Sequence, residues 1–469
     1  MSIRNFRAFL FAALAAASVQ SIPARDAAVS VEESVRNRTG FAVRWQQDAE
    51  AREECLRTVH SLLGKPLTMR SAVQIALLNN RDLLMTFEDI GVSAADLREA
   101  GLWKNPSIDL SVRFPDRPSR GPDWEESAAF DLLDLLMIPL RKRVAADHLE
   151  AARLRVADAV LKLVADAKRA FFMLQASEEL VSKMNVARET EQVALELAQK
   201  QHEAGNITDL DLLRQQARYD EARLDLASVE SDRRGQREAL NRLLGLWGQD
   251  TEWKVTASLP QLPSSDPSIS GLESLAVVQR FDLAAAHVEL SSQVRALGLT
   301  KSYRYIGALQ FGADTEREKE GDHLTGPKLT LELPIFNQGQ ARIARGEAEL
   351  RRAERKVENI AIEIRSEVRE LADQLAAKRE TVRFYQDEIL PGRAAILQQS
   401  LLRYNGMLLG NYELFAARTE EAAAERKAVE ALRDYWTTRA DLERAVGGSL
   451  SAKKTPPSER KTQISKRKP

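Results

Sequence analysis

The residues best suited to chemistry are scattered along this sequence. The chain has one cysteine, Cys55, and five histidines, which are His60, His148, His202, His287 and His323. No histidine pair has the i, i+4 spacing with a third ligand that a zinc site needs, and a single cysteine forms no internal disulfide. A phosphate-binding loop and the GxSxG motif are also absent from the sequence. We therefore interpret each histidine as an isolated surface residue and expect no catalytic residue, no metal site, no cofactor and no enzyme activity.

The composition indicates long helices. Charged residues make up 29% of the chain and aromatic residues only 6%, and Ala, Glu, Arg and Leu dominate long stretches. This mixture is typical of coiled coils rather than of a compact enzyme. The formal net charge is −1, so the charge balance gives no indication of nucleic-acid binding.

The first 24 residues have the pattern of a secretory signal peptide. Arg4 and Arg7 precede an apolar run at residues 8–19, and small residues follow it. A membrane anchor is the alternative, but this run is too short to span a bilayer. No cysteine directly follows the run, so we expect no lipid anchor. No later segment has the ~20 apolar residues of a transmembrane helix, so entry into a membrane would require a β-barrel.

The remaining sequence contains two copies of one unit, spaced by about two hundred residues. The first copy covers residues 66–245 and follows an N-terminal extension at residues 25–65. The second covers residues 271–448, after an irregular linker at residues 246–270. Each copy reads as helix, strand, polar loop, strand, proline, long helix, turn, helix and glycine. The matched positions are Asp82 and Asp282, Pro139 and Pro334, Gly205 and Gly406, and Gly245 and Gly447.

Each copy contains one predicted β-hairpin. The first hairpin, residues 106–138, has strands at 107–114 and 128–138. The second, residues 303–335, has strands at 303–313 and 328–333 around a polar loop. Apolar and polar residues alternate along these strands, which predicts one apolar face and one polar face. The alternation slips near Leu132, where we expect a bulge or a bend. Pro139 and Pro334 mark the predicted transitions from strand to helix.

Two long helix hairpins, residues 140–244 and 337–446, make up most of the chain. Residues 140–204 contain no proline or glycine, and apolar residues recur there at intervals of three and four. This pattern predicts antiparallel coiled-coil packing. Pro391 should kink the second long helix before its tip. The last segment, residues 449–469, is rich in Lys and Arg and should be disordered.

The four strands of one chain cannot close a barrel, because an open sheet has edges that lipid does not tolerate. Three chains would contribute twelve strands, which is within the range of outer-membrane barrels. We therefore predict a mainly α fold with a small β part. In it, a trimeric 12-stranded β-barrel with four strands per chain continues into a long periplasmic α-helical barrel.

Several segments resemble the TolC family of outer-membrane efflux proteins. They are PLTMRSAVQIALLNNRDL at 66–83, GLWKNPSIDL at 101–110, LPIFNQGQARIARGEAEL at 333–350 and LLRYNGMLLGNYELFAAR at 401–418. The resemblance covers residues 66–448. It implies a homotrimer in outer-membrane lipid, with a periplasmic tunnel that meets a periplasmic adaptor protein. It also implies an inner-membrane pump, for which the resistance-nodulation-division type is a candidate. Metal ions, drugs and proteins all remain open as substrates.

The resemblance also assigns roles to the two helix tips. The predicted docking residues for the adaptor are Gly205, Asn206, Ile207, Thr208, Gly406, Met407, Leu408, Leu409 and Gly410. The predicted periplasmic gate consists of Asp209, Asp211, Tyr404 and Glu413. Leu409 stands where the family often has a gate arginine. The alternatives are that Asp209 and Asp211 cap a helix and that Glu413 lies on a solvated helix face.

A protein without a pore is the competing hypothesis. A periplasmic coiled-coil adaptor or structural tether would explain the helices and the signal peptide equally well. It would not explain two equivalent hairpins, each placed between a medium and a long helix. The sequence therefore favours an outer-membrane channel subunit of a tripartite export system.

Overall fold

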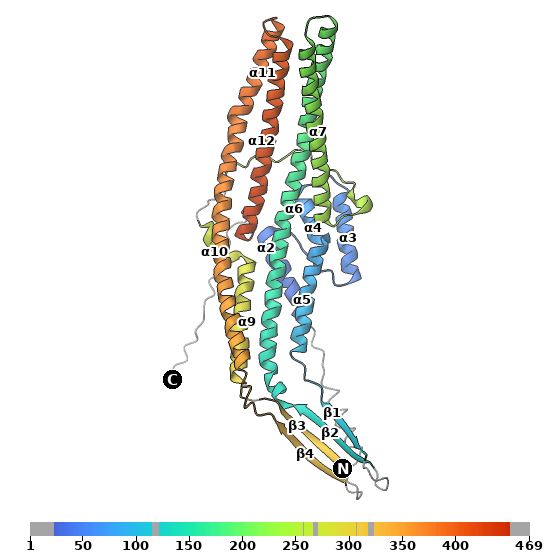
Figure 1. Cartoon of the computed structure of the whole chain (residues 1–469), viewed down its shortest axis with the longest axis vertical. Coiled ribbons are helices and arrows are strands. Elements are labelled where there is room, and N and C mark those ends of the chain that lie inside the picture. Colours follow the sequence, from blue (N-terminus) through green and yellow to red (C-terminus); the bar gives the residue numbers. More distant parts are fainter. Residues whose placement is uncertain are drawn as a thin grey trace.

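The molecule is a long helical rod that ends in a small sheet (Figure 1). The structure, a computed structural model, describes residues 23–114, 122–256, 258–265, 271–305, 307–317 and 323–450. Residues 1–22 of the predicted signal peptide and 451–469 of the predicted tail lie outside these ranges. The described elements are mostly helices with four strands, which confirms the prediction of a mainly α fold with a small β part.

The same order of elements occurs twice. The first half comprises α2 (Pro23–Thr39), α3 (Ala49–Leu63), α4 (Met69–Asn79), α5 (Arg81–Glu99), β1 (Ser107–Arg113), β2 (Asp123–Asp131), α6 (Leu132–Glu203) and α7 (Asp209–Leu244). A 3-10 turn, Gly248–Thr251, lies in the linker. The second half comprises α8 (Leu272–Gln279), α9 (Phe281–Ser302), β3 (Leu309–Arg317), β4 (His323–Leu331), α10 (Gln340–Phe384), the π-helical turn η2 (Tyr385–Ile389), α11 (Leu390–Asn405) and α12 (Asn411–Val446). Each half ends at a left-handed glycine, Gly245 or Gly447.

The strands form one antiparallel sheet in the order β1-β2-β3-β4, so the pairing of β2 with β3 joins the two halves. The register gathers apolar side chains on one face, for example in the rows Ile108–Ala128–Ala313 and Phe130–Phe311–Leu329. The other face carries rows such as Asp109–Ser127–Asp314. Glu126 and Arg317 are exceptions, because they lie opposite Leu110 and Trp124 on the apolar face. The sheet is therefore amphipathic, with β1 and β4 at its edges.

The predicted strand at residues 128–138 is wrong in its second half. The strand ends at Asp131, whose carboxylate accepts a hydrogen bond from the Asp134 amide at 3.0 Å and caps α6. The buried Asp134 carboxylate pairs in turn with Arg141 and Lys104, at 2.6 and 3.1 Å. An apolar run of this length fits a strand or a helix equally well, and here the aspartate cap selects the helix.

The transition predicted at Pro139 is therefore also wrong, because Pro139 lies inside α6. Pro334 lies in the connection between β4 and α10. The predicted strand 303–313 is corrected too, since residues up to Ser302 are helical and β3 begins at Leu309. Strand β4 starts earlier than the predicted 328–333, at His323.

Helix α6 runs along most of the length of the molecule. It has 72 residues and spans roughly 108 Å at ~1.5 Å per residue. Every apolar residue of its predicted seam is buried: Val160, Val164, Ala167, Phe171, Leu174, Val181 and Met184. In the second half, η2 interrupts the α-helical pattern just before Pro391, which lacks the backbone amide hydrogen that a regular helix needs as a donor. Within the described residues, we find no helix with an apolar stretch long enough to cross a membrane.

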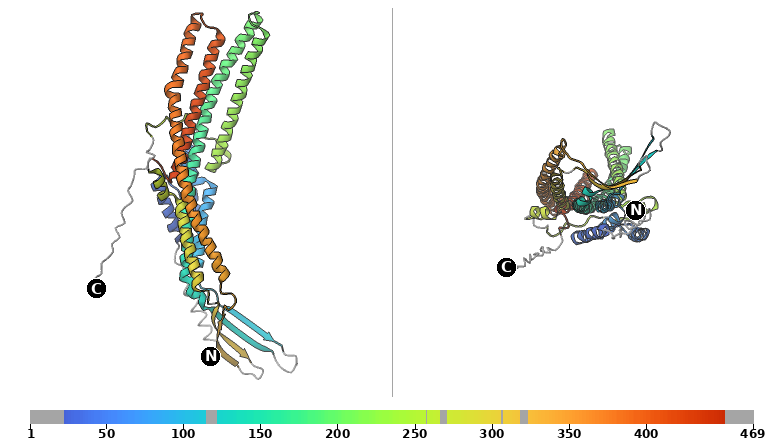
Figure 2. Two further views of the ribbon diagram at one scale, coloured as in Figure 1. Left: turned by 60° about the vertical axis from the view of Figure 1, so that its left-hand side comes forward. Right: turned by 90° about the horizontal axis from the view of Figure 1, so that it is seen from below.

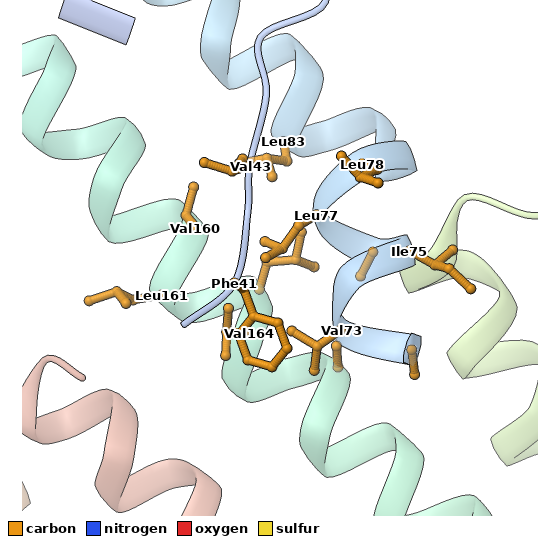
Figure 3. Packing of buried hydrophobic residues seen from close by; sticks show 14 of the residues in the cluster. Phe41, Val43, Val73, Ile75, Leu77, Leu78, Leu83, Val160, Leu161 and Val164 are labelled. Carbon is orange, nitrogen blue, oxygen red and sulfur yellow. The ribbon is translucent and has the colours of Figure 1, made fainter. Parts of the chain in front are cut away.

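The N-terminal extension is a folded part of the core. Phe41 and Val43 extend along α4 and α6 and pack against Val73, Leu83 and Val160 (Figure 3). Figure 2 shows α2 and α3 lying against the outside of the helical rod near its middle.

Arg38 ties this extension to the second half. Its guanidinium donates to the Gln279 carbonyl and lies 3.7 Å from the centre of the Phe281 ring. Its own carbonyl accepts a hydrogen bond from the Ser449 amide at 3.1 Å. One residue of the extension thus holds both the start of α9 and the end of the described chain.

Candidate functional site at the helical tips

The predicted functional residues lie at the end of the rod opposite the sheet, where the two long hairpins turn (Figure 1). The first tip joins α6 to α7, and the second joins α11 to α12. Both tips are solvent-exposed loops of similar length, so the residues at each turn can be compared one by one.

The first tip turns at Gly205, which is left-handed with φ +72°. The Gly205 amide donates to the His202 carbonyl at 2.9 Å, and the Asn206 amide donates to the Gln201 carbonyl at 2.8 Å. This pair of bonds is a Schellman motif, which satisfies the last carbonyls of a helix. Thr208 then caps α7, because its hydroxyl accepts a hydrogen bond from the Asp211 amide.

The second tip turns at a methionine, although a glycine stands next to it. Gly406 has φ −82°, whereas Met407 has φ 58°, the only positive φ among the described non-glycine residues. The Met407 amide donates to the Tyr404 carbonyl at 2.9 Å, and the Leu408 amide donates to the Arg403 carbonyl at 2.8 Å. The matching of Gly205 with Gly406 is therefore wrong by one residue.

The two turns have the same hydrogen-bond pattern when Gly205 is matched with Met407. The other matched pairs are then Asn206 with Leu408, Ile207 with Leu409, Thr208 with Gly410, and Asp211 with Glu413. Ile207 and Leu409 are both half-buried. Leu409 is thus the apolar counterpart of Ile207 in this fold.

Asp209 pairs within its own hairpin. Its Oδ1 atom lies 2.6 Å from Nε2 of His202, across the turn between α6 and α7. In the described chain, the Tyr404 hydroxyl forms no hydrogen bond, so Asp209 and Tyr404 are not joined inside one copy. The interpretation of His202 as an isolated surface residue is wrong. The sequence contains a signal for this pair, because His202 and Asp209 lie at equal distances before and after the middle of the turn and so face each other across it. The interpretation as an isolated surface residue is also wrong for His60, whose Nε2 atom lies 3.5 Å from Oδ2 of Asp250.

Asp211 and Glu413 both act at helix starts. The Thr208 hydroxyl donates to the Asp211 carboxylate at 2.8 Å, and this bond lowers the pKa of Asp211 below its ordinary value. Glu413 accepts a hydrogen bond from the Gly410 amide at 3.1 Å. Carboxylates in the first turn also interact favourably with the helix dipole. The capping role expected for Asp209 belongs instead to Thr208.

Polar contacts also cross between the hairpins near the tips. The Tyr412 hydroxyl donates to Gln201 at 2.8 Å. The Thr419 hydroxyl lies 2.7 Å from a Glu191 carboxylate oxygen and 3.0 Å from the Phe415 carbonyl of its own helix, and its one proton is shared between these two acceptors. Gln215 of α7 donates to the other oxygen of Glu191 at 2.8 Å. Sequence reasoning missed these residues, because their contacts depend on the register between helices that lie far apart in the chain.

The tips present exposed apolar side chains to the solvent. Within the described ranges, no group of three His, Cys, Asp or Glu residues is arranged to hold a metal ion. Met407 and Leu408 are the most exposed apolar side chains there, at 94% and 80%. Such residues at the end of a rigid rod suit a docking surface, because apolar side chains gain most from being covered by a partner.

Comparisons with known proteins agree with this arrangement. Residues 72–246 match the family model described as "Outer membrane efflux protein". A comparison with curated protein sequences finds no match. Among solved structures, the chain is similar to the Campylobacter jejuni CmeC outer membrane channel, with 18% identity and a TM-score of 0.71. That match covers 82% of this chain and 87% of that one.

Two further structures have the same fold. The Neisseria gonorrhoeae MtrE outer membrane channel, solved in its open state, has 18% identity and a TM-score of 0.66, covering 82% of this chain and 90% of that one. The outer membrane protein VceC of Vibrio cholerae has 15% identity and a TM-score of 0.64, covering 87% of this chain and 98% of that one. The likeness therefore extends over both halves, whereas the family model matches the first.

Proposed function

We propose that this chain, whose residues 72–246 match the outer membrane efflux protein family and whose fold is that of solved outer membrane channels, is the channel subunit of a tripartite export system. Three copies form a passive conduit from the periplasm to the exterior. The conduit docks onto a periplasmic adaptor, and an inner-membrane pump supplies the energy. The chain is not an enzyme, and its helical rod extends from the outer membrane into the periplasm.

The observation that carries this proposal is the amphipathic sheet with two unpaired edges. Its apolar face includes Ile108, Leu110 and Leu329, which are between 61% and 70% exposed in one chain. In a single molecule, this face and the edges of β1 and β4 would be costly, because exposed edges invite pairing with other strands. Pairing β1 of one copy with β4 of the next removes both edges and gives lipid the apolar face.

An adaptor or tether without a pore accounts for less of the structure. Such a protein would use the helices and the tips in the same way. It would have no use for four strands whose register separates apolar from polar rows across both halves. The sheet therefore favours a channel subunit over an adaptor or tether without a pore.

The test is the behaviour of the full chain in membranes. Expressed with its own leader, the protein should fractionate with the outer membrane, run as a trimer by native mass spectrometry and form pores in planar lipid bilayers. A water-soluble monomer that forms no pore would contradict the proposal.

The tips supply the gate and the docking surface of this channel. Asp209, Asp211, Tyr404 and Glu413 narrow the periplasmic end, where links between neighbouring copies hold it shut. Three copies of Glu413 add an acidic ring, which favours cations. Residues 205–208 and 406–410 meet the adaptor.

The gate has its own test in single-channel recordings. Asp209→Ala combined with Tyr404→Phe should loosen the closed tip and raise the conductance of the resting channel. Asp250→Ala, far from the tips in the linker, is the matched control. A double variant that conducts like the wild type would remove these residues from the gate.

A further inference from the structure

A polar cavity lies in the part of the rod next to the sheet, where three helices run side by side. Helix α9 packs against α6 on one side and against α10 on the other (Figure 1). The cavity has a volume of about 260 Å³, and all three helices contribute to its lining. This volume is close to the lower limit of ligand pockets, which is ~300 Å³, so the cavity suits a small ligand.

Small residues make room for this cavity. Each helix contributes one of them to the lining: Ala151 on α6, Ser292 on α9 and Ala353 on α10. Helices that pack side by side normally fill the space between them with larger side chains. The other lining side chains are longer and polar. The cavity is therefore a polar space inside the wall of the rod.

The carboxylates of the lining are already neutralised. Each has at least one cationic partner: Glu289 pairs with Arg155 and Lys356, Asp147 with Arg295, and Glu349 with Arg345. The Glu289 carboxylate lies 3.7 Å from Arg155 and 2.7 Å from Lys356, so it bridges α6, α9 and α10. The cations at the cavity outnumber its carboxylates, and a cationic ligand would find no carboxylate without a partner.

Three other lining side chains offer hydrogen-bond donors. Ser292 is only 3% exposed, yet its hydroxyl forms no hydrogen bond within the described part of the chain. The Gln293 amide and the Arg352 guanidinium likewise have no hydrogen bond or ion pair among the described residues. A buried hydroxyl without a partner is costly, and all three groups can donate. The cavity is thus surrounded by donors that lack acceptors.

We propose that this cavity binds a small oxyanion. Arg352 supplies the charge and a planar group that can donate to two oxygens at once, while Ser292 and Gln293 donate to the others. The bound anion lies between α6, α9 and α10 and strengthens the wall that Glu289 also bridges. One chain contributes every residue of this site, so binding does not depend on the proposed channel function.

Isothermal titration calorimetry with inorganic phosphate tests the site on the purified full-length protein. Chloride balances the ionic strength of each solution, so the screening of surface charges stays constant. Arg352→Gln should lower the affinity for phosphate about tenfold or more, because it removes hydrogen bonds from a charged donor. Ser292→Ala should lower it by about threefold to fivefold, because it removes a neutral donor.

A third variant fills the cavity and removes no polar group. Ala353→Leu puts a large side chain in place of a small one, so phosphate binding should be lost, while the helix keeps a residue of high helix propensity. The matched control is Arg365→Gln, an exposed arginine of α10 that lies outside the cavity lining and has no ion pair among the described residues. It should bind phosphate like the wild type. Circular dichroism establishes that the helices of each variant are intact.

The proposed site is overturned if the wild-type protein binds no phosphate, or if Arg352→Gln and Ala353→Leu bind it as tightly as the wild type. An equal loss of binding in Arg365→Gln would also overturn it, because phosphate would then be binding to surface charge in general. A protein that binds phosphate here but forms no pores in planar bilayers would refute the channel function and leave the anion site standing.

Discussion

The two tips share one backbone conformation but expose different side chains. The first turns on Gly205 and Asn206, whereas the second turns on Met407 and Leu408 with the same pair of Schellman hydrogen bonds. Glycine adopts the left-handed conformation without cost, but a methionine there costs roughly 1–2 kcal/mol. The turn would form at lower cost with glycine, so a methionine at this position favours a role for its exposed side chain rather than for the turn. The second tip is therefore the better candidate for the tighter contact with a partner.

The largest expected effect comes from giving the second tip the residues of the first. Met407→Gly with Leu408→Asn removes two apolar side chains while it keeps the turn. Burial of such a side chain contributes roughly 1.5–3 kcal/mol, so affinity for the adaptor of the same export system should fall at least tenfold. Surface plasmon resonance measures this. If Asn206→Ala at the first tip weakens binding as much, the two tips dock equally and the comparison fails.

A smaller effect is expected when the first tip receives the residue of the second. Nothing lies within 4 Å of the position that a Cβ atom would take at Gly205, so Gly205→Met meets no steric clash. The cost is conformational alone, and the free energy of unfolding should fall by roughly 1–2 kcal/mol. Thermal unfolding followed by circular dichroism measures it. Met407→Gly should change stability in the opposite direction, and a loss of stability there would show that Met407 is not strained.

The smallest effect should come from the helix caps. Thr208→Gly copies the cap of the second tip, Gly410, and should cost only roughly a few tenths of a kcal/mol at neutral pH. Because the Thr208 bond lowers the pKa of Asp211, its stabilisation is present above the unfolded pKa of about 3.9. It is lost as the pH falls through the folded pKa. The difference between the melting curves of the two proteins should thus shrink in acid, where only the bond from the Asp211 amide to the Thr208 hydroxyl remains, and a constant difference down to pH 2 would exclude the Asp211 carboxylate as a cause.

Periodicity made much of the fold predictable. The alternation at residues 107–114 gave β1, and the spacing of Val160, Phe171 and Met184 gave the buried seam of α6. The end of β2 was not predictable in this way, because an apolar run fits both a strand and a helix. It depends on the local bond between Asp131 and Asp134.

The position of the candidate site at the two helix turns was predictable, but the contacts of its individual residues were not. Glycine and polar residues mark both turns, yet the left-handed position depends on where the helix stops, and that made Met407 rather than Gly406 the turning residue. The pairing of His202 with Asp209 can be predicted only when the middle of the turn is known to lie between Gly205 and Asn206. The Glu191 contacts require the register between α6 and α12, and no local pattern specifies that register.

The bond between the Arg38 carbonyl and the Ser449 amide has a consequence for biogenesis. A chain that crosses the inner membrane from its N-terminus presents Arg38 to the periplasm long before Ser449. The extension cannot complete its contacts until residue 449 has also been secreted. Final closure of the subunit therefore requires both halves of the chain in the periplasm, which disfavours assembly from chains that lack the second half.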